Sequence, residues 1–126
     1  MIENILDAAA VLALLQNERG RNRVADVLDR SAVGKVNVTQ ILTTLVNKGS
    51  LLEDVVRAFD SLDVPVIEFE RVQSEKAAEL RPPTKHLGFS LGDRACLALA
   101  IQENATAVTA DRNWKDLNVC KIELIR

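Results

Sequence analysis

Aromatic side chains are scarce in this sequence. There is no tyrosine, and phenylalanine and tryptophan together make up only 3% of the residues. The chain is nevertheless 48% hydrophobic, so its core must be built from leucine, valine, isoleucine and alanine. A chain of 126 residues is long enough for one sizeable core. We therefore expect a single domain over residues 1–126.

Long apolar runs are also missing. Charged residues interrupt every hydrophobic segment well before it reaches the length of a bilayer span. The N-terminus has neither the basic start nor the uninterrupted apolar stretch of a secretory signal. These absences predict a cytoplasmic protein with no membrane partner.

Cysteine and histidine are too few for several kinds of site. Cys96 and Cys120 lie far apart in apolar surroundings, so we interpret them as small buried hydrophobes rather than a disulfide. No second cysteine or histidine lies at metal-ligand spacing. The single histidine, His86, follows Pro82-Pro83 and is far from any nucleophile, which argues against a serine or cysteine hydrolase. We expect it to face solvent, with contact to a substrate as the lesser alternative.

Positive charge is not in excess either. The formal net charge is −2 and the pI is about 5.4, which excludes a general electrostatic binder of nucleic acid. Binding of RNA would then need a local patch or bound cations. The densest basic cluster comprises Arg19, Arg21 and Arg23, which could guide RNA or form an ordinary solvated surface.

Apolar runs alternate with helical patterns along the whole chain. This alternation is typical of an α/β fold with a mainly parallel sheet. Strands are expected at residues 3–6, 35–38, 65–69, 106–110 and 121–125. Helices are expected at residues 8–17, from 20 onward, at 39–49 with Gly49 closing the helix, at 51–62, at 70–80 with Pro82-Pro83 stopping it, and at 91–104.

Three aspartates lie at the junctions of these elements. Asp7 and Asp111 follow strands, and Asp93 lies in the first turn of the helix that begins near Ser90. The carboxyl ends of parallel strands share one edge of a sheet, so the three should lie on the same edge. Taken singly, each is more simply explained as a helix cap. Taken together, they would repel one another unless a cation lay between them, and an all-oxygen site suits Mg²⁺ or Mn²⁺. The residues alone therefore lead to an acidic metal site in an α/β domain.

Four segments in order carry a resemblance over nearly the full chain: ILDAAAVLALLQNE, VNVTQILTTL, LGFSLGDRACLALA and VTADRNW. The chain resembles the PIN-domain ribonuclease toxins of VapC type. The resemblance implies an α/β/α sandwich, an Mg²⁺ or Mn²⁺ ion held by acidic residues, and an endoribonuclease that cleaves RNA. It also implies a homodimer that is neutralised by an antitoxin encoded alongside it.

The resemblance also assigns residues. Asp7, Asp93 and Asp111 match the metal-binding acids of the family, and Thr109 matches a hydroxyl residue that supports the site. Gln40 stands where such toxins usually carry a glutamate. Two milder departures are Asn113, where some members have a further acid, and Ala9, where many have a serine.

Gln40 leaves three interpretations open. The chain could be an enzyme that works with three aspartates, a natural non-catalytic PIN domain that binds antitoxin or RNA, or an engineered inactive form. A glutamine keeps the shape of glutamate but carries no charge and cannot act as a base. A signalling receiver domain, another small α/β fold with an acidic pocket, fits poorly because adjacent acids after the first strand and a matching lysine are missing.

Several neighbouring residues have two interpretations each. Arg94 and Arg112 could bind substrate phosphates together with Asn113, but a salt bridge to a neighbouring carboxylate is the more ordinary role. Trp114 is expected to anchor the loop after Asp111 by packing. The apolar faces of residues 40–46 and 51–62 predict a partner surface, unless the two helices simply pack against the sheet and each other.

Overall fold

A single parallel sheet runs through the middle of the molecule. The computed structural model describes all residues 1–126, and its five strands lie in the order β3-β2-β1-β4-β5 with every neighbouring pair parallel. The strands are β1 (Asn4–Leu6), β2 (Ser31–Gly34), β3 (Val66–Ile67), β4 (Thr106–Thr109) and β5 (Ile122–Leu124).

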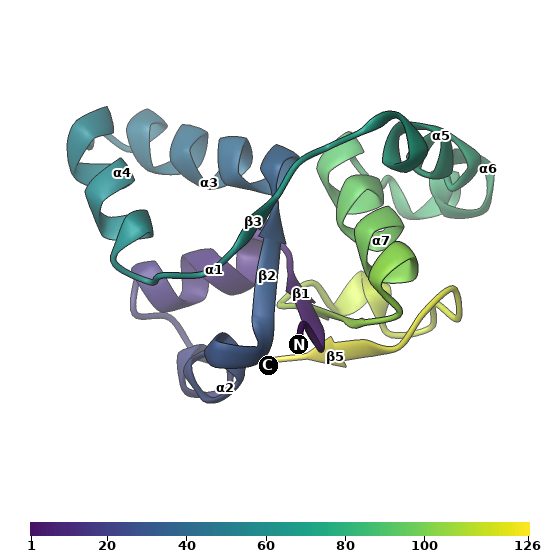
Figure 1. Ribbon diagram of the computed structural model, residues 1–126, viewed down its shortest axis with the longest axis horizontal. Helices are drawn as coiled ribbons and strands as arrows, with labels where there is room; N and C mark the ends of the chain where they lie inside the picture. The colour runs from purple at the N-terminus through teal and green to yellow at the C-terminus, as the bar shows by residue number, and fades with distance from the viewer.

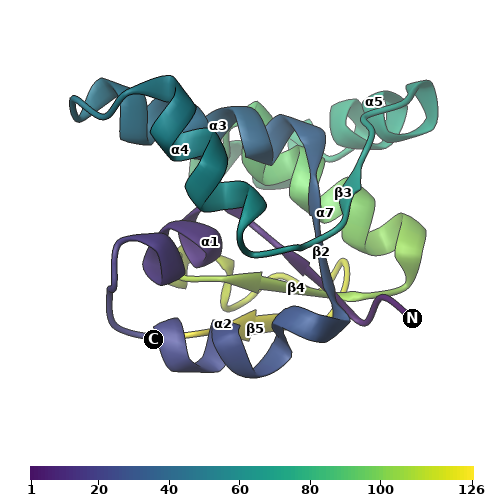
Figure 2. The ribbon, with the colours of Figure 1, turned by 60° about the vertical axis from the view of Figure 1, so that its left-hand side comes forward.

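Seven α-helices flank this sheet. In Figure 1, α1, α3 and α4 lie to the left of the strands, and α5, α6 and α7 lie to the right. This is the α/β/α arrangement that the sequence predicts. The helices are α1 (Ala8–Leu15), α2 (Arg21–Val27), α3 (Lys35–Asn47), α4 (Leu52–Asp60), α5 (Arg71–Glu79), α6 (Arg81–Thr84) and α7 (Leu91–Glu103). Turned by 60°, the molecule shows α2 running beside β5, and the N-terminus lies at the far end of β1 from α1 (Figure 2).

The alternation of side chains along the strands divides the core in two. Ile5, Ala32 and Ala107 lie at one level of register and belong to the cluster under α5 and α7. Their successors Leu6 and Val33, with Val108, point the other way into the cluster under α1 to α4. A period of two therefore buries both faces of the central strands.

One predicted strand is wrong. Residues 35–38 open α3, and the second strand is the preceding segment, Ser31–Gly34, which is buried throughout. Val36 and Val38 alternate with polar neighbours as they would in a strand. The buried positions of the helix, however, are Asn37 and Ile41, which are four residues apart as a helix requires. Gln40 consequently lies in the second turn of α3 and does not begin the helix.

The helix-ending signals are confirmed, with one addition. Gly49 has a φ of +107° and follows Lys48, the C-cap of α3, and this left-handed conformation suits glycine at the position after the cap. The predicted stop after residue 80 is also found, because α5 ends at Glu79. Pro82 and Pro83 then lie in the first turn of the short helix α6, where a proline needs no hydrogen-bond partner.

The structure confirms the expected burial of Cys96 and Trp114, whereas Cys120 is only half-buried. Cys96 and Cys120 are both free, and Cys96 is fully buried. Trp114 is completely buried and packs against Phe89 with 5.4 Å between the ring centroids. It is the packing anchor expected beneath the loop after Asp111. None of the helices combines the length and apolarity that a bilayer span requires.

Candidate active site

Asp7 joins the central strand to the first helix. It is extended in backbone conformation and caps α1, and its Oδ1 accepts a hydrogen bond of 2.8 Å from the Ala10 N–H. Asp7 is only 4% exposed. The capping interpretation is therefore correct for Asp7, and a carboxylate is buried at the carboxyl end of β1.

Thr109 ties Asp7 to Asp111. The Thr109 hydroxyl donates to Asp7 Oδ2 and accepts from the Asp111 N–H at 2.9 Å. The pairing of β1 with β4 brings these residues together, because Leu6 and Val108 are in register just before them. A fully buried threonine thus fixes the relative positions of the first and last acids of the site.

Asp93 and Asp111 are also helix caps. Asp93 forms a reciprocal capping box with Ser90: its Oδ2 accepts from the Ser90 N–H at 2.9 Å, and its own N–H donates to Ser90 Oγ at 3.2 Å. Asp111 caps the 3-10 helix Arg112–Trp114 by accepting from the Asn113 N–H at 2.9 Å. In each case, one carboxylate oxygen makes the cap and the second has no hydrogen bond within the protein.

The three carboxylates act on one another electrostatically. The pKa of Asp7 is raised from 3.8 to about 7, mainly by burial and to a smaller extent by the charges of Asp93 and Asp111, which together outweigh the lowering effect of the bonds from Thr109 and Ala10. The expectation that all three lie on the same edge of the sheet is confirmed. Such a site opposes the loss of the Asp7 proton unless positive charge is supplied nearby.

Gln40 lies against the first turn of α7. A Cβ on Gly92 would stand 2.0 Å from Gln40 Nε2, so the missing side chain of Gly92 makes room for the glutamine amide. The amide is held by Asn37, whose Nδ2 donates to Gln40 Oε1 at 2.8 Å and to the Gly92 carbonyl at 3.1 Å. These hydrogen bonds hold the Gln40 side chain against Gly92, the residue before Asp93.

Asn37 is the residue that the sequence interpretation missed. It is 1% exposed, and its Oδ1 is buried without a hydrogen-bond partner. The available signal was its spacing: a polar residue three positions before Gln40 shares a face with it on a helix. Placing a strand at residues 35–38 concealed that relation.

The donor set matches a hard divalent cation in chemistry. It consists of aspartate oxygens with a supporting hydroxyl, the ligand type that Mg²⁺ and Mn²⁺ prefer. No three acidic, histidine or cysteine side chains are gathered closely enough to hold a metal as they stand. The site therefore supplies ligands of the right type, and the three carboxylates would have to come closer together to share one cation.

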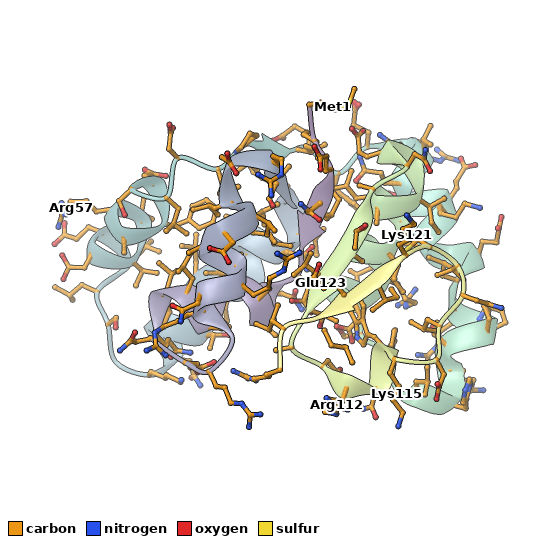
Figure 3. The ribbon with its side chains drawn as sticks, turned by 90° about the horizontal axis from the view of Figure 1, so that it is seen from below. Met1, Arg57, Arg112, Lys115, Lys121 and Glu123 are labelled. Atoms are coloured by element: carbon orange, nitrogen blue, oxygen red, sulfur yellow. The ribbon has the colours of Figure 1, made fainter.

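The two arginines beside the acids do not form the expected salt bridges. Arg94 donates to the Ala77 carbonyl at 3.0 Å, which ties α7 to α5, and Arg112 donates to the carbonyl of Arg126 at 3.0 Å. Arg112 is exposed, and Figure 3 shows it beside Lys115 at the lower edge of the view. These two cations form a local basic patch beside Asp111 on an otherwise acidic chain.

Two of the three arginines in the other basic cluster make contacts within the protein. Arg23 pairs with Glu123, and Arg21 donates to the Glu18 carbonyl at 3.3 Å. His86 is exposed, as expected.

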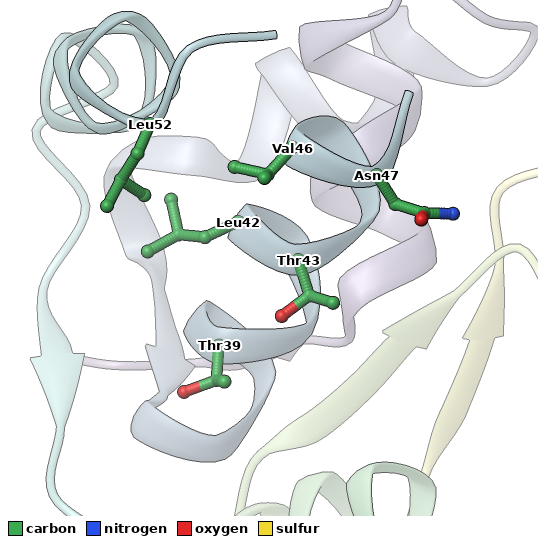
Figure 4. Close-up of a pocket in the computed structure, with 6 residues that line it drawn as sticks. All are labelled: Thr39, Leu42, Thr43, Val46, Asn47 and Leu52. Carbon is green, nitrogen blue, oxygen red and sulfur yellow. The ribbon is translucent and has the colours of Figure 1, made fainter. Parts of the chain in front are cut away.

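An apolar hollow lies on the outer surface of α3 and α4. It has a volume of about 420 Å³, and Leu42, Val46 and Leu52 point toward one another across it (Figure 4). Leu51 and Leu52 are 62% and 57% exposed. The same helices bury Ile41, Val55 and Phe59 in the core, so packing accounts for one face of each helix and leaves the other apolar and uncovered.

Comparison with known proteins identifies the fold family. The PIN domain family model matches residues 5–119. The chain belongs to the PIN-domain family. This confirms the family resemblance on which the site residues were assigned.

Several solved structures share the fold of the whole chain. One is VapBC2 from Rickettsia felis bound to a DNA fragment from its promoter, at 20% identity, 98% coverage of both chains and a TM-score of 0.77. Another is DNA-bound VapBC from Salmonella typhimurium, at 18% identity, 100% coverage of both chains and a TM-score of 0.78. VapBC-5 from Mycobacterium tuberculosis matches at 19% identity over 100% of this chain and 99% of that chain, with a TM-score of 0.66. No curated protein matches the sequence significantly.

Proposed function

We propose that this PIN domain is the toxin of a type II toxin–antitoxin module and a metal-dependent endoribonuclease. The observation that carries the proposal is the buried Asp7 carboxyl, which is linked through Thr109 to Asp111 and whose pKa is raised to about 7 beside two further carboxylates. Capping explains each acid singly, but it does not explain why three carboxylates that repel one another lie near the carboxyl edge of a parallel sheet, a position typical of ligand sites.

Asp7, Asp93 and Asp111 would hold the cation, which is Mg²⁺ or Mn²⁺. When bound, it activates water and neutralises charge on the scissile phosphate. Thr109 keeps Asp7 oriented by donating to one of its oxygens, and this bond favours the ionised carboxylate that a cation requires. Arg112 and Asn113 are exposed beside Asp111; Arg112 would contact the RNA backbone, and Asn113 would contact another part of the substrate. Arg94 is a weaker candidate for such a contact because it is only half-exposed and donates to the Ala77 carbonyl, whereas Arg112 is exposed.

Gln40 decides how much activity the chain retains. The amide can donate to or orient a water molecule, but it cannot accept a proton from one. Asn37 donates to Gln40 Oε1, and a glutamate oxygen in the same place would accept the same bond. The pocket therefore suits either side chain, and Gln40→Glu should add a charge without moving α3.

The antitoxin would occupy the apolar surface of α3 and α4. The related structures are VapBC complexes, and an uncovered apolar hollow of this size is typical of a protein-binding surface. A homodimer belongs to the same proposal by resemblance to the family.

The test compares this chain with Gln40→Glu and with the doubly changed Gln40→Glu, Asp111→Asn on labelled RNA with Mn²⁺ or Mg²⁺. We expect the Gln40→Glu protein to cut at least ten times faster than the parent, and the loss of Asp111 or addition of EDTA to stop it. If no variant cuts any RNA under these conditions, the nuclease proposal is wrong.

One alternative has a specific observation in its favour. A non-catalytic PIN domain that binds antitoxin or RNA would keep the fold and the caps while tolerating a neutral residue at Gln40. It predicts that Gln40→Glu gains no activity while antitoxin or RNA binding persists in the parent chain.

A further inference from the structure

A second cavity lies beside the acidic site and is separate from the proposed cation site. Its volume is about 280 Å³, and two separate segments line it, residues 83–87 and residues 113–119. Both segments lead directly into the acidic site. The Asn113 N–H donates to the capping carboxylate of Asp111. Leu87 lies three residues before Ser90, whose N–H donates to the carboxylate of Asp93.

The two walls of this cavity are fixed from beneath. Phe89 follows the first segment, Trp114 belongs to the second, and their rings are in contact in the core. In the first wall, the Thr84 hydroxyl is buried and donates to the Leu80 carbonyl at 2.7 Å. The cavity is thus bounded by two anchored turns, a preformed arrangement of the kind that small ligands use.

The lining combines flat apolar surface with unused polar groups. Leu87 and Leu117 contribute apolar walls, while His86, Asn118 and Asp116 contribute polar edges. None of these three polar side chains makes a hydrogen bond within the protein, and neither does the Asn113 amide. A ring that stacks on histidine and presents donors and acceptors at its edge would satisfy both kinds of surface.

Charge at the rim favours a nucleic acid as the source of that ring. Lys85, Arg112 and Lys115 are exposed beside the residues that line the cavity, and none of them pairs with an aspartate or glutamate, while Arg112 donates to the main-chain oxygen of Arg126. Unpaired cations beside a stacking surface are the combination found in proteins that bind single strands.

We propose that this cavity binds one unstacked nucleobase of single-stranded RNA, next to the phosphate that the acidic site would cleave. The inference rests on the proposed ribonuclease function. His86 stacks on the base, and Asn113 and Asn118 contact its edge, so the cavity selects which nucleotide lies beside the cleaved bond.

The test uses neutral nucleosides, because they probe the cavity without requiring a metal or suffering repulsion from the acids. His86 is the only histidine of the chain, so its ring protons give unique NMR signals. We expect adenosine, guanosine, cytidine or uridine to shift the His86 ring signals and the Asn113 and Asn118 side-chain amide signals saturably, with different affinities for different bases. Ribose alone should shift none of them.

Matched variants sharpen the result. His86→Ala should weaken nucleoside binding about tenfold, a change within the range for losing one base–aromatic stack, as measured by the Asn118 amide shift. Asn22→Ala, an exposed substitution on α2, should leave binding unchanged. The inference is overturned if no nucleoside gives a saturable shift, or if ribose gives the same shifts as the nucleosides.

These outcomes are independent of cleavage. An active Gln40→Glu enzyme whose His86 signals ignore every nucleoside would retain the nuclease proposal and refute the base cavity. Saturable, base-dependent binding in a protein that never cuts would refute the nuclease and leave a base-binding PIN domain.

Discussion

At the scale of single residues, Asp7 carries two demands that conflict. Its carboxylate caps α1 and accepts from Thr109, and both bonds favour the charged form. Its burial beside two other acids favours the neutral form and dominates, so its pKa is raised to about 7. Without a metal, burial and repulsion between the carboxylates therefore destabilise the ionised form of Asp7 near neutral pH, as expected for a site arranged to bind a cation.

The pH dependence of stability follows from this shift. Because the folded protein holds the Asp7 proton more tightly than the unfolded chain, the free energy of unfolding should fall as pH rises from about 4 to 7. The slope contributed by Asp7 is at most about 1.4 kcal/mol per pH unit. Asp7→Asn retains a capping side chain and removes the titration.

Urea unfolding in EDTA from pH 4 to pH 8 measures the effect. We expect the stability of Asp7→Asn relative to the parent to increase with pH across this window. Parallel pH profiles for the two proteins would show that Asp7 titrates at its ordinary value when folded.

The positions of the acids were predictable, whereas the contact of Gln40 was not. Asp7, Asp111 and Asp93 follow from strand ends and a capping pattern that local sequence reveals. The Asn37–Gln40 hydrogen bond depends on the helical register of α3, and alternating valines concealed that register.

At the scale of elements, the contact between α3 and α7 determines the shape of the site. Asn37 lies at this contact and donates hydrogen bonds to Gln40 and to the Gly92 carbonyl. Sequence patterns predicted α7 and the C-terminal end of α3, where the end signals are clear, but they placed the start of α3 four residues too late. They could not predict that a glycine in α7 would accommodate a glutamine from α3, because that fit arises only when the helices are packed.

A double-mutant cycle tests this contact. Gly92→Ala should displace the Gln40 amide, since its Cβ would lie 2.0 Å from Nε2, and should lose a hydrogen bond of about 1 kcal/mol. In a Gln40→Ala background, the same change meets no glutamine and should be neutral or stabilising, because alanine favours a helix by up to about 1 kcal/mol.

Urea unfolding of the four proteins gives the coupling energy. The structure predicts about 1 kcal/mol between the two positions. Additive effects would mean that Gln40 does not lie against Gly92 in solution.

At the scale of the whole molecule, the uncovered face is that of α3 and α4. The sequence indicated too much apolar surface there, and Leu51, Leu52 and Val46 are exposed. The sequence could not show which face of these helices packs against the core and which stays exposed. The apolar residues of α4 extend around the helix beyond those that the core covers.

A charge placed on this face should prevent partner binding. Leu52→Asp should reduce co-purification with the co-expressed antitoxin at least tenfold without changing the unfolding temperature by more than a few degrees, because Leu52 is exposed. Val72→Asp is the matched control, since Val72 is 70% exposed on α5, away from this surface. Equal co-purification by both variants would place the antitoxin elsewhere.

The most direct test of the proposed active site is to determine where a divalent cation binds. Substoichiometric Mn²⁺ broadens the NMR signals of nuclei near its site, and the measurement needs no substrate. We predict that the amide signals of Ala8, Arg94 and Arg112 disappear first, and that Asp111→Asn weakens the effect at least tenfold. Broadening centred on surface acids away from the sheet edge, or none at all, would contradict the assignment of this site as a metal-dependent nuclease centre.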